Sequence, residues 1–149
     1  MVAKTWYECK VSYLRPGDDG LFTKTTESYL VDAINFTEAE KIVTERVSSF
    51  SSGEFVVNGI KKMKLSEVFL NYEGDRWYRC KVIMTIVDEE KQKEKELACA
   101  MLISAFSLDE ALTNLNKNLS NSMSDYRIAS LSEMSLMDIF VYTPSDSEE

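Results

Sequence analysis

The sequence predicts an α+β fold in which the chain is internally duplicated into two ββαβ halves. Three observations support this prediction. WYECKV at 6–11 recurs as WYRCKV at 77–82. Two capped helical patterns follow at matching positions. GEFVVNGIKKMKLSEVF at 53–69 also aligns without a gap on SDYRIASLSEMSLMDIF at 124–140. Because a unit this small buries only a limited core alone, we expect the halves to pack about a pseudo-twofold axis, like an isologous dimer joined into one chain.

Each half is expected to begin with two antiparallel strands. Residues alternate in character with a period of two from Trp6 onward and again from Trp77 onward, which is typical of a half-buried strand. The face that carries Tyr7, Cys9 and Val11 is the predicted core face. Turn-forming residues then predict a hairpin tip at 15–20, and a charged stretch predicts the second tip at 88–93. The return strands are expected to run to residues 33 and 105.

A helix is expected after each hairpin. Asn35 and Ser107 each precede a glutamate by three positions, which is the capping-box pattern. The final segment of each half begins like a strand, but the pattern leaves the structure of 59–69 and 130–140 open. The apolar residues of the two helices have the spacing that buries one helical face, and they match in pairs: Phe36, Ala39, Val43 and Val47 with Leu108, Ala111, Leu115 and Leu119.

We expect a single domain over residues 1–142, with repeats at about 4–70 and 75–141 and a disordered acidic tail at 143–149. The net charge is −8, which disfavours binding of nucleic acid through the overall field. No apolar run approaches the ~20 residues that span a bilayer, and no secretory signal is recognised. A cytoplasmic location with reduced thiols is therefore expected.

Two tryptophans are candidates for ligand binding. Trp6 and Trp77 should lie on the sheet face opposite the predicted core face, beside cations. Proteins that bind single strands stack bases on aromatic side chains and hold phosphates with cations. The alternative is that both tryptophans are buried in the core or between the halves. The candidate residues on this face are Trp6, Lys10, Trp77, Arg79 and Lys81.

A dense basic cluster, Lys61, Lys62 and Lys64, occurs in the first half alone. The residues that align with it in the second half are Ser132, Glu133 and Ser135. Because a role in folding would more readily appear in both halves, the cluster is a candidate for contact with a partner. An ordinary solvated face is the favoured interpretation.

Little in the sequence points to catalysis. The chain contains no histidine, so imidazole-bound zinc is excluded and the commonest general base is missing. No phosphate-binding or dinucleotide-binding pattern occurs. Cys9, Cys80 and Cys99 are expected to be small buried hydrophobes, although a disulfide or redox pair between the first two is conceivable. We expect no catalytic residue, no cofactor and no metal site.

Several stretches together resemble a known family: WYECKV, YLVDA at 29–33, FTEAE at 36–40, GEFVVNGIKK, DRWYRCKV at 75–82 and MSDY at 123–126. They resemble an uncharacterised domain family, a DUF, found in Bacteroidetes and their bacteriophages. The likeness spans nearly the whole chain. It implies a bacterial or phage protein of unknown biochemical role, and it supplies no catalytic residue.

The predicted function is therefore a non-enzymatic, cytoplasmic interaction or regulatory protein of a bacterium or phage, with an unidentified protein partner. The alternative is an accessory protein that binds single-stranded nucleic acid through the face with Trp6 and Trp77. An enzyme of unfamiliar type is a third possibility.

Overall fold

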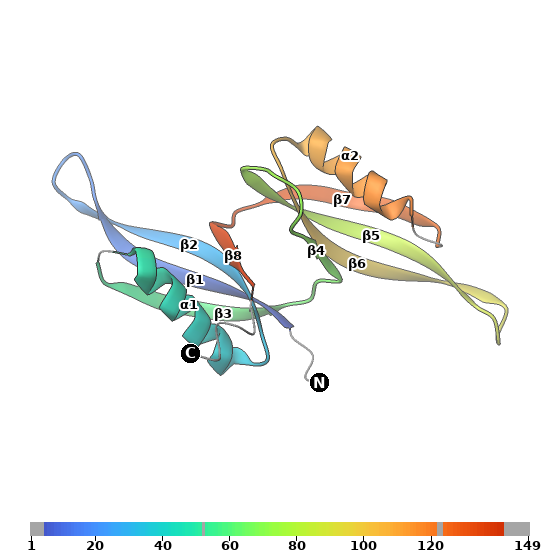
Figure 1. The fold of residues 1–149 in the computed structure, drawn as a ribbon, viewed down its shortest axis with the longest axis horizontal. Helices are drawn as coiled ribbons and strands as arrows, with labels where there is room; N and C mark the ends of the chain where they lie inside the picture. Colours follow the sequence, from blue (N-terminus) through green and yellow to red (C-terminus); the bar gives the residue numbers. More distant parts are fainter. Residues whose placement is uncertain (1–4, 52, 122–123, 142–149) are drawn as a thin grey trace. The chain divides into compact units, whose positions relative to one another are not determined.

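The computed structural model describes residues 5–51, 53–121 and 124–141, and they form two four-stranded sheets with one helix on each (Figure 1). The predicted α+β class is thereby confirmed. The chain divides into two compact units. Unit 1 comprises 1–64 together with 136–149, and unit 2 comprises 65–135.

Unit 1 has the strand order β3-β1-β2-β8. β1 (Thr5–Pro16) and β2 (Phe22–Ala33) form the expected antiparallel hairpin. β3 (Phe55–Met63) pairs antiparallel with β1, and the short β8 (Asp138–Phe140) pairs parallel with β2. The helix α1 (Phe36–Phe50) covers one face of this sheet, which we call the helix side.

The core of unit 1 lies between α1 and the helix side of its sheet. Tyr7, Cys9 and Val11 are buried there, as the alternation in β1 predicts, and they form one apolar cluster with the buried stripe of α1. The first residue of the predicted stripe departs from the expectation. Phe36 is 52% exposed; it lies in the first helical turn, and its ring contacts that of Tyr7 at an interplanar angle of 64° with 4.9 Å between centroids. Its counterpart Leu108 is 49% exposed.

Unit 2 has the order β4-β6-β5-β7. β5 (Arg76–Asp88) and β6 (Lys93–Ala105) form the hairpin, α2 (Leu108–Leu119) follows, and β7 (Tyr126–Met134) pairs with β5. The short β4 (Glu67–Phe69) pairs parallel with β6. The two sheets correspond strand for strand when the order of unit 2 is reversed: β7, β5, β6 and β4 take the places of β3, β1, β2 and β8. Both sheets also carry a register shift at one place, between Lys10 and Val11 and between Lys81 and Val82.

The sequence left the structure of 59–69 and 130–140 open. Residues 59–69 contain the end of β3 and the short strand β4, and residues 130–140 contain the end of β7 and the short strand β8. Each half therefore contains one strand more than the ββαβ prediction. β4 ends the first half of the sequence but belongs to unit 2, whereas β8 ends the second half but belongs to unit 1. Each sheet is thus completed by a strand from the other half of the sequence.

The helix caps are confirmed. The side chain of Asn35 accepts a hydrogen bond from the amide of Glu38, and Ser107 accepts one from Glu110. Both glutamates reach back to the residue before the cap rather than to the cap itself, since Glu38 accepts from the amide of Ile34. The predicted tail at 143–149 lies outside the described residues. In the described part of the chain, neither helix combines the length and the apolar character needed to cross a membrane.

Candidate ligand-binding cleft in unit 1

The β1–β2 hairpin continues past the C-terminal end of α1, so the helix does not cover the outer part of the helix side (Figure 1). A cleft of about 1070 Å³ lies there. Its floor is formed by β1 and β2, including Val11, Tyr13, Glu27 and Tyr29. The last turn of α1, Ser51, Gly53, Glu54 and the start of β3 supply its walls.

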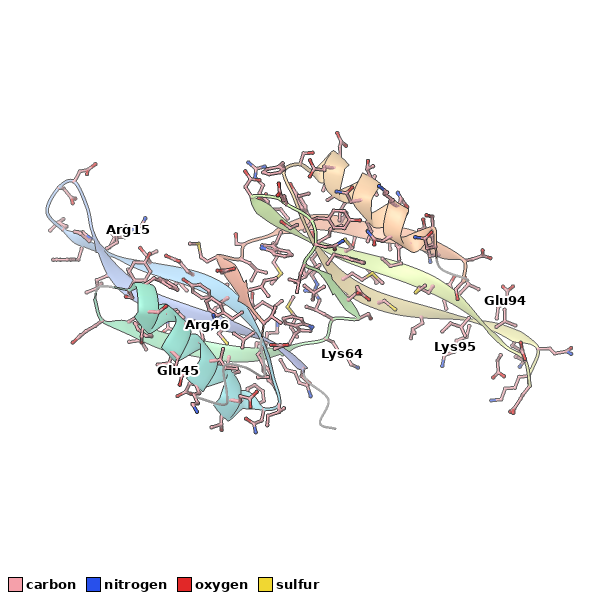
Figure 2. All side chains as sticks on the ribbon, viewed as in Figure 1. Arg15, Glu45, Arg46, Lys64, Glu94 and Lys95 are labelled. Carbon is pink, nitrogen blue, oxygen red and sulfur yellow. The ribbon has the colours of Figure 1, made fainter. Side chains whose placement is uncertain are left out.

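Glu27 is the centre of the hydrogen bonds in this cleft. It pairs with the core residue Val11 in the sheet and is half-buried. The hydroxyl of Tyr13 donates to one oxygen of its carboxylate, and the hydroxyl of Tyr29 donates to the other at 3.2 Å. Arg15 donates to the Tyr13 oxygen at 3.3 Å, and its guanidinium carbon lies 6.0 Å from the centroid of the Tyr13 ring (Figure 2). The result is a chain of contacts from Arg15 through Tyr13 to Glu27 and Tyr29.

Both tyrosines are held in the protonated form. The hydrogen bond to Glu27 raises the pKa of Tyr13, and Arg15 offsets part of that effect. Burial, followed by the negative charge of Glu27, raises the pKa of Tyr29 to about 12. Because deprotonation would place two negative charges side by side, each hydroxyl remains a hydrogen-bond donor over the whole neutral range.

Aromatic rings surround this polar centre. The ring of Tyr29 stacks on Phe140 of β8 at 5.2 Å between centroids, and it lies 6.3 Å from Phe50 at the end of α1. Phe55 lines the cleft from β3 and is half-buried. The guanidinium carbon of Arg46 of α1 lies over the ring of Phe140, 5.8 Å from its centroid. Packed rings on several elements fix Tyr29, and with it the carboxylate of Glu27.

A second polar cluster lies at the bulge in β3, where Ser12 and Asn58 border the cleft from the strand face opposite to Val11 and Tyr13. Ser12 is only 5% exposed, and its hydroxyl lies 2.8 Å from that of Thr26. The side-chain amide of Asn58 donates to Ser12. Asn58 is the extra residue of the bulge, since its neighbours Val57 and Gly59 pair with consecutive residues of β1. The bulge therefore turns an amide toward a buried hydroxyl.

Unit 2 has apolar or weakly polar residues at every position that corresponds to these two clusters. The correspondence follows from the strand registers: Glu27 faces Val11, as Cys99 faces Val82, and Tyr29 faces Cys9, as Met101 faces Cys80. Unit 2 adopts the same strand order without these polar groups, so the fold does not require them. The counterparts of Ser12, Tyr13, Thr26, Glu27, Tyr29 and Asn58 are Ile83, Met84, Ala98, Cys99, Met101 and Ala129.

The sequence reasoning missed this site, although its signal was present in the alignment of the two halves. Comparing the halves drew attention to Lys61, Lys62 and Lys64 because they form one continuous run. The polar residues of the cleft are scattered over three strands and become neighbours only through pairing, for example Ser12 opposite Thr26.

Trp6 and Trp77 each alternate with the buried residues of their strand, β1 or β5, and the residues beside them differ between the two strands. Trp6 and Trp77 are both half-buried, and Lys10, Arg79 and Lys81 are exposed. On β1, Glu8 lies between Trp6 and Lys10, whereas β5 has Arg79 at that position. Only the β5 face therefore combines an aromatic ring with an uninterrupted pair of cations.

The lysine cluster has a partly structural explanation. Lys61 of β3 pairs with Glu8 of β1, and its counterpart Ser132 pairs with Arg79. Because a lysine opposite an arginine would be unfavourable, this part of the asymmetry follows from the exchange of Glu8 for Arg79. Lys62 pairs with Tyr7, and Lys64 lies beyond β3; both are exposed.

The cysteines are thiols, and two of them are buried as expected. Cys9 and Cys80 are fully buried, and burial raises the pKa of each thiol to about 12. Cys99 is half-buried. Over the described ranges, no three His, Cys, Asp or Glu side chains are gathered as metal ligands would be.

Comparison with known proteins identifies a family and no function. Neither the curated proteins nor the solved structures give a significant match. The profile of a domain of unknown function, DUF4494, matches residues 5–142, which cover unit 2 and most of unit 1. The chain therefore belongs to the DUF4494 family.

Proposed function

We propose that this protein is a non-enzymatic binding protein, an interaction or regulatory protein that holds its ligand in the cleft of unit 1. One observation carries the proposal: the polar groups of the cleft are replaced by apolar residues at the corresponding positions of unit 2. Buried polar groups cost free energy unless they are paired. Their presence in one unit alone is best explained by recognition of a ligand.

The chemistry of the cleft supports binding rather than catalysis. A general acid or base works best when its pKa lies near the working pH. The pKa values of Tyr13 and Tyr29 are raised, away from neutrality. Glu27 accepts a hydrogen bond from each of the two tyrosine hydroxyls, so it serves as an acceptor in this network.

The duplication belongs to the same proposal. The shared strand order, registers and bulge support an origin as two copies of one unit, of which the first acquired binding groups. The family resemblance supports a bacterial or phage origin, and we infer a cytoplasmic setting.

An NMR screen of a fragment library against the full ¹⁵N-labelled chain tests the binding function. We expect the hits to shift amide signals of β1, β2 and the end of α1, including Tyr13 and Glu27. Signals around the corresponding residues Met84 and Cys99 should stay in place. Hits spread evenly over both units would contradict the proposal, and conversion of a bound fragment into a product would indicate an enzyme instead.

The face of β5 supports a second candidate, binding of single-stranded nucleic acid. Trp77, Arg79 and Lys81 share one face of this strand, and both cations are exposed. Titration with single-stranded DNA and RNA should then quench tryptophan fluorescence in a saturable way that weakens with salt. The variant Arg79→Ala/Lys81→Ala should reduce the quenching, whereas Lys10→Ala serves as the matched control on β1. A flat titration rules this candidate out.

A further inference from the structure

The chemistry of the cleft narrows the class of ligand. We propose, building on the binding function above, that the cleft recognises a primary ammonium group carried on an apolar body. The ammonium would contact the carboxylate of Glu27, and the apolar body would lie against the rings of Tyr29, Phe50 and Phe55.

The position of Glu27 is the first argument. An ionised carboxylate has about four acceptor positions and no donor. Tyr13 and Tyr29 use one position on each oxygen, and Glu27 lines the cleft. The remaining acceptor positions suit a donor with several N–H groups and a positive charge, since charge-assisted hydrogen bonds are about twice as strong as neutral ones.

The aromatic rings are the second argument. The faces of aromatic rings attract cations, with ~0.5–2 kcal/mol per contact depending on solvation. The protein's own Arg15 already demonstrates this preference, because its guanidinium lies over Tyr13 and donates to the hydroxyl that binds Glu27. Arg15 is exposed, so an incoming ammonium can take its place beside the network.

The charges around the cleft are the third argument. Glu27 and Glu54 line the cleft together with Arg15 and Lys24, so its charges balance in number. Of these four residues, Glu27 is half-buried and the other three are exposed. A ligand that reaches the floor of the cleft therefore meets the carboxylate of Glu27, which favours a cation over an anion.

Probes that share one shape and differ in charge give a direct test. Binding of 2-phenylethylamine, 2-phenylethanol and phenylacetate to the full chain is measured by NMR titration and calorimetry at neutral pH. We expect the amine to bind in the cleft at least about ten-fold more tightly than the alcohol, which is the size of effect of one hydrogen bond to a charged group. Phenylacetate should bind weakest.

Variants of the cleft supply the controls. Glu27→Gln keeps the size of the side chain and one acceptor oxygen. It should weaken binding of the amine about ten-fold and leave binding of the alcohol unchanged. Arg15→Ala removes the competing cation and should strengthen binding of the amine. A purely structural role of Arg15 would not produce this effect. Glu54→Gln, a carboxylate in the wall outside the tyrosine network, should have a smaller effect than Glu27→Gln. Melting curves establish that each variant is folded.

Two sources of the ammonium are distinguished in the same titration. A blocked peptide with one lysine among apolar residues is compared with its acetyl-lysine counterpart, which lacks the charge. Tighter binding of the peptide than of the free amine assigns the cleft to a lysine of a protein partner; the reverse assigns it to a small amine.

The outcomes separate this inference from the binding function on which it rests. If the alcohol or the acid binds in the cleft as tightly as the amine, the ammonium inference is overturned and the binding function stands. If no probe and no library fragment shifts the cleft signals, both are overturned.

Discussion

At the scale of single residues, the half-buried carboxylate of Glu27 controls the chemistry of its neighbours. Two tyrosine hydroxyls donate to it. The hydrogen bond to Glu27 is the main cause of the raised pKa of Tyr13, whereas burial, followed by the charge of Glu27, raises the pKa of Tyr29. Elsewhere in the structure, burial alone has the same effect on the thiol of Cys80, whose pKa rises to about 12. All of these groups are neutral when protonated, and the fold favours that form.

Stability should therefore decline at alkaline pH. The folded pKa of Tyr29, Cys9 and Cys80 is raised to about 12, from 10.0 for the tyrosine and 9.0 for the thiols. Above pH 9 the unfolded chain releases protons that the folded chain retains, so the free energy of unfolding falls as pH rises toward 12. The stabilising contribution of these three groups is fully present below pH 9. Urea unfolding between pH 7 and 11 measures this. Tyr29→Phe should show a shallower decline, and a pH-independent free energy would contradict the assignment.

At the scale of elements, the two helices depend on their first turns. Asn35 and Ser107 satisfy amides that have no partner within the helix, and a glutamate in each first turn complements the helix dipole. α1 has no basic residue in its last turn. That end borders the cleft, where Phe50 and Ser51 form part of the wall.

The cap of α1 should be measurable by substitution. Asn35→Ala removes the acceptor for the amide of Glu38 and should lower the free energy of unfolding by about 1 kcal/mol. Asn35→Asp retains an acceptor, so its free energy of unfolding should stay near that of wild type. Thr37→Ala, at an exposed position of the same turn, is the matched control. Denaturant unfolding checks all three, and equal losses for Ala and Asp at position 35 would show that the cap is not the cause.

Long periodic elements were predictable from sequence, and short ones were not. The alternation in β1 and β5 and the capped stripes of both helices identify their elements because many residues repeat one pattern. β4 and β8 have three residues each, which is too short for a period, and their partners lie far away in the sequence. The cleft was missed for the same reason, since strand pairing rather than sequence order brings its polar residues together.

At the scale of the whole molecule, the exchange of β4 and β8 makes each unit depend on the other half of the sequence. Phe140 illustrates this. It lies at the end of the second half of the sequence but is 7% exposed in the core of unit 1, stacked on Tyr29. The binding cleft of unit 1 is thus supported by a residue from the far end of the chain.

Phe140→Ala should therefore destabilise unit 1 rather than unit 2. Removal of a buried phenylalanine side chain costs about 3–5 kcal/mol. Hydrogen exchange followed by mass spectrometry should show faster exchange in β1, β2 and α1, with unit 2 little changed. Phe69→Ala in β4 is the reciprocal variant and should accelerate exchange in unit 2. Faster exchange in unit 2 after Phe140→Ala would contradict this assignment of the strands.

The most direct measurement compares wild type with the double variant Tyr13→Met/Glu27→Cys, under reducing conditions. These substitutions give the cleft the residues that unit 2 has at Met84 and Cys99. We expect the free energy of unfolding to change by less than about 1 kcal/mol, because neither side chain is fully buried, while binding of 2-phenylethylamine is lost. A folded variant that binds the amine as wild type does would show that the cleft groups do not serve recognition, and an unfolded variant would show that they serve the fold.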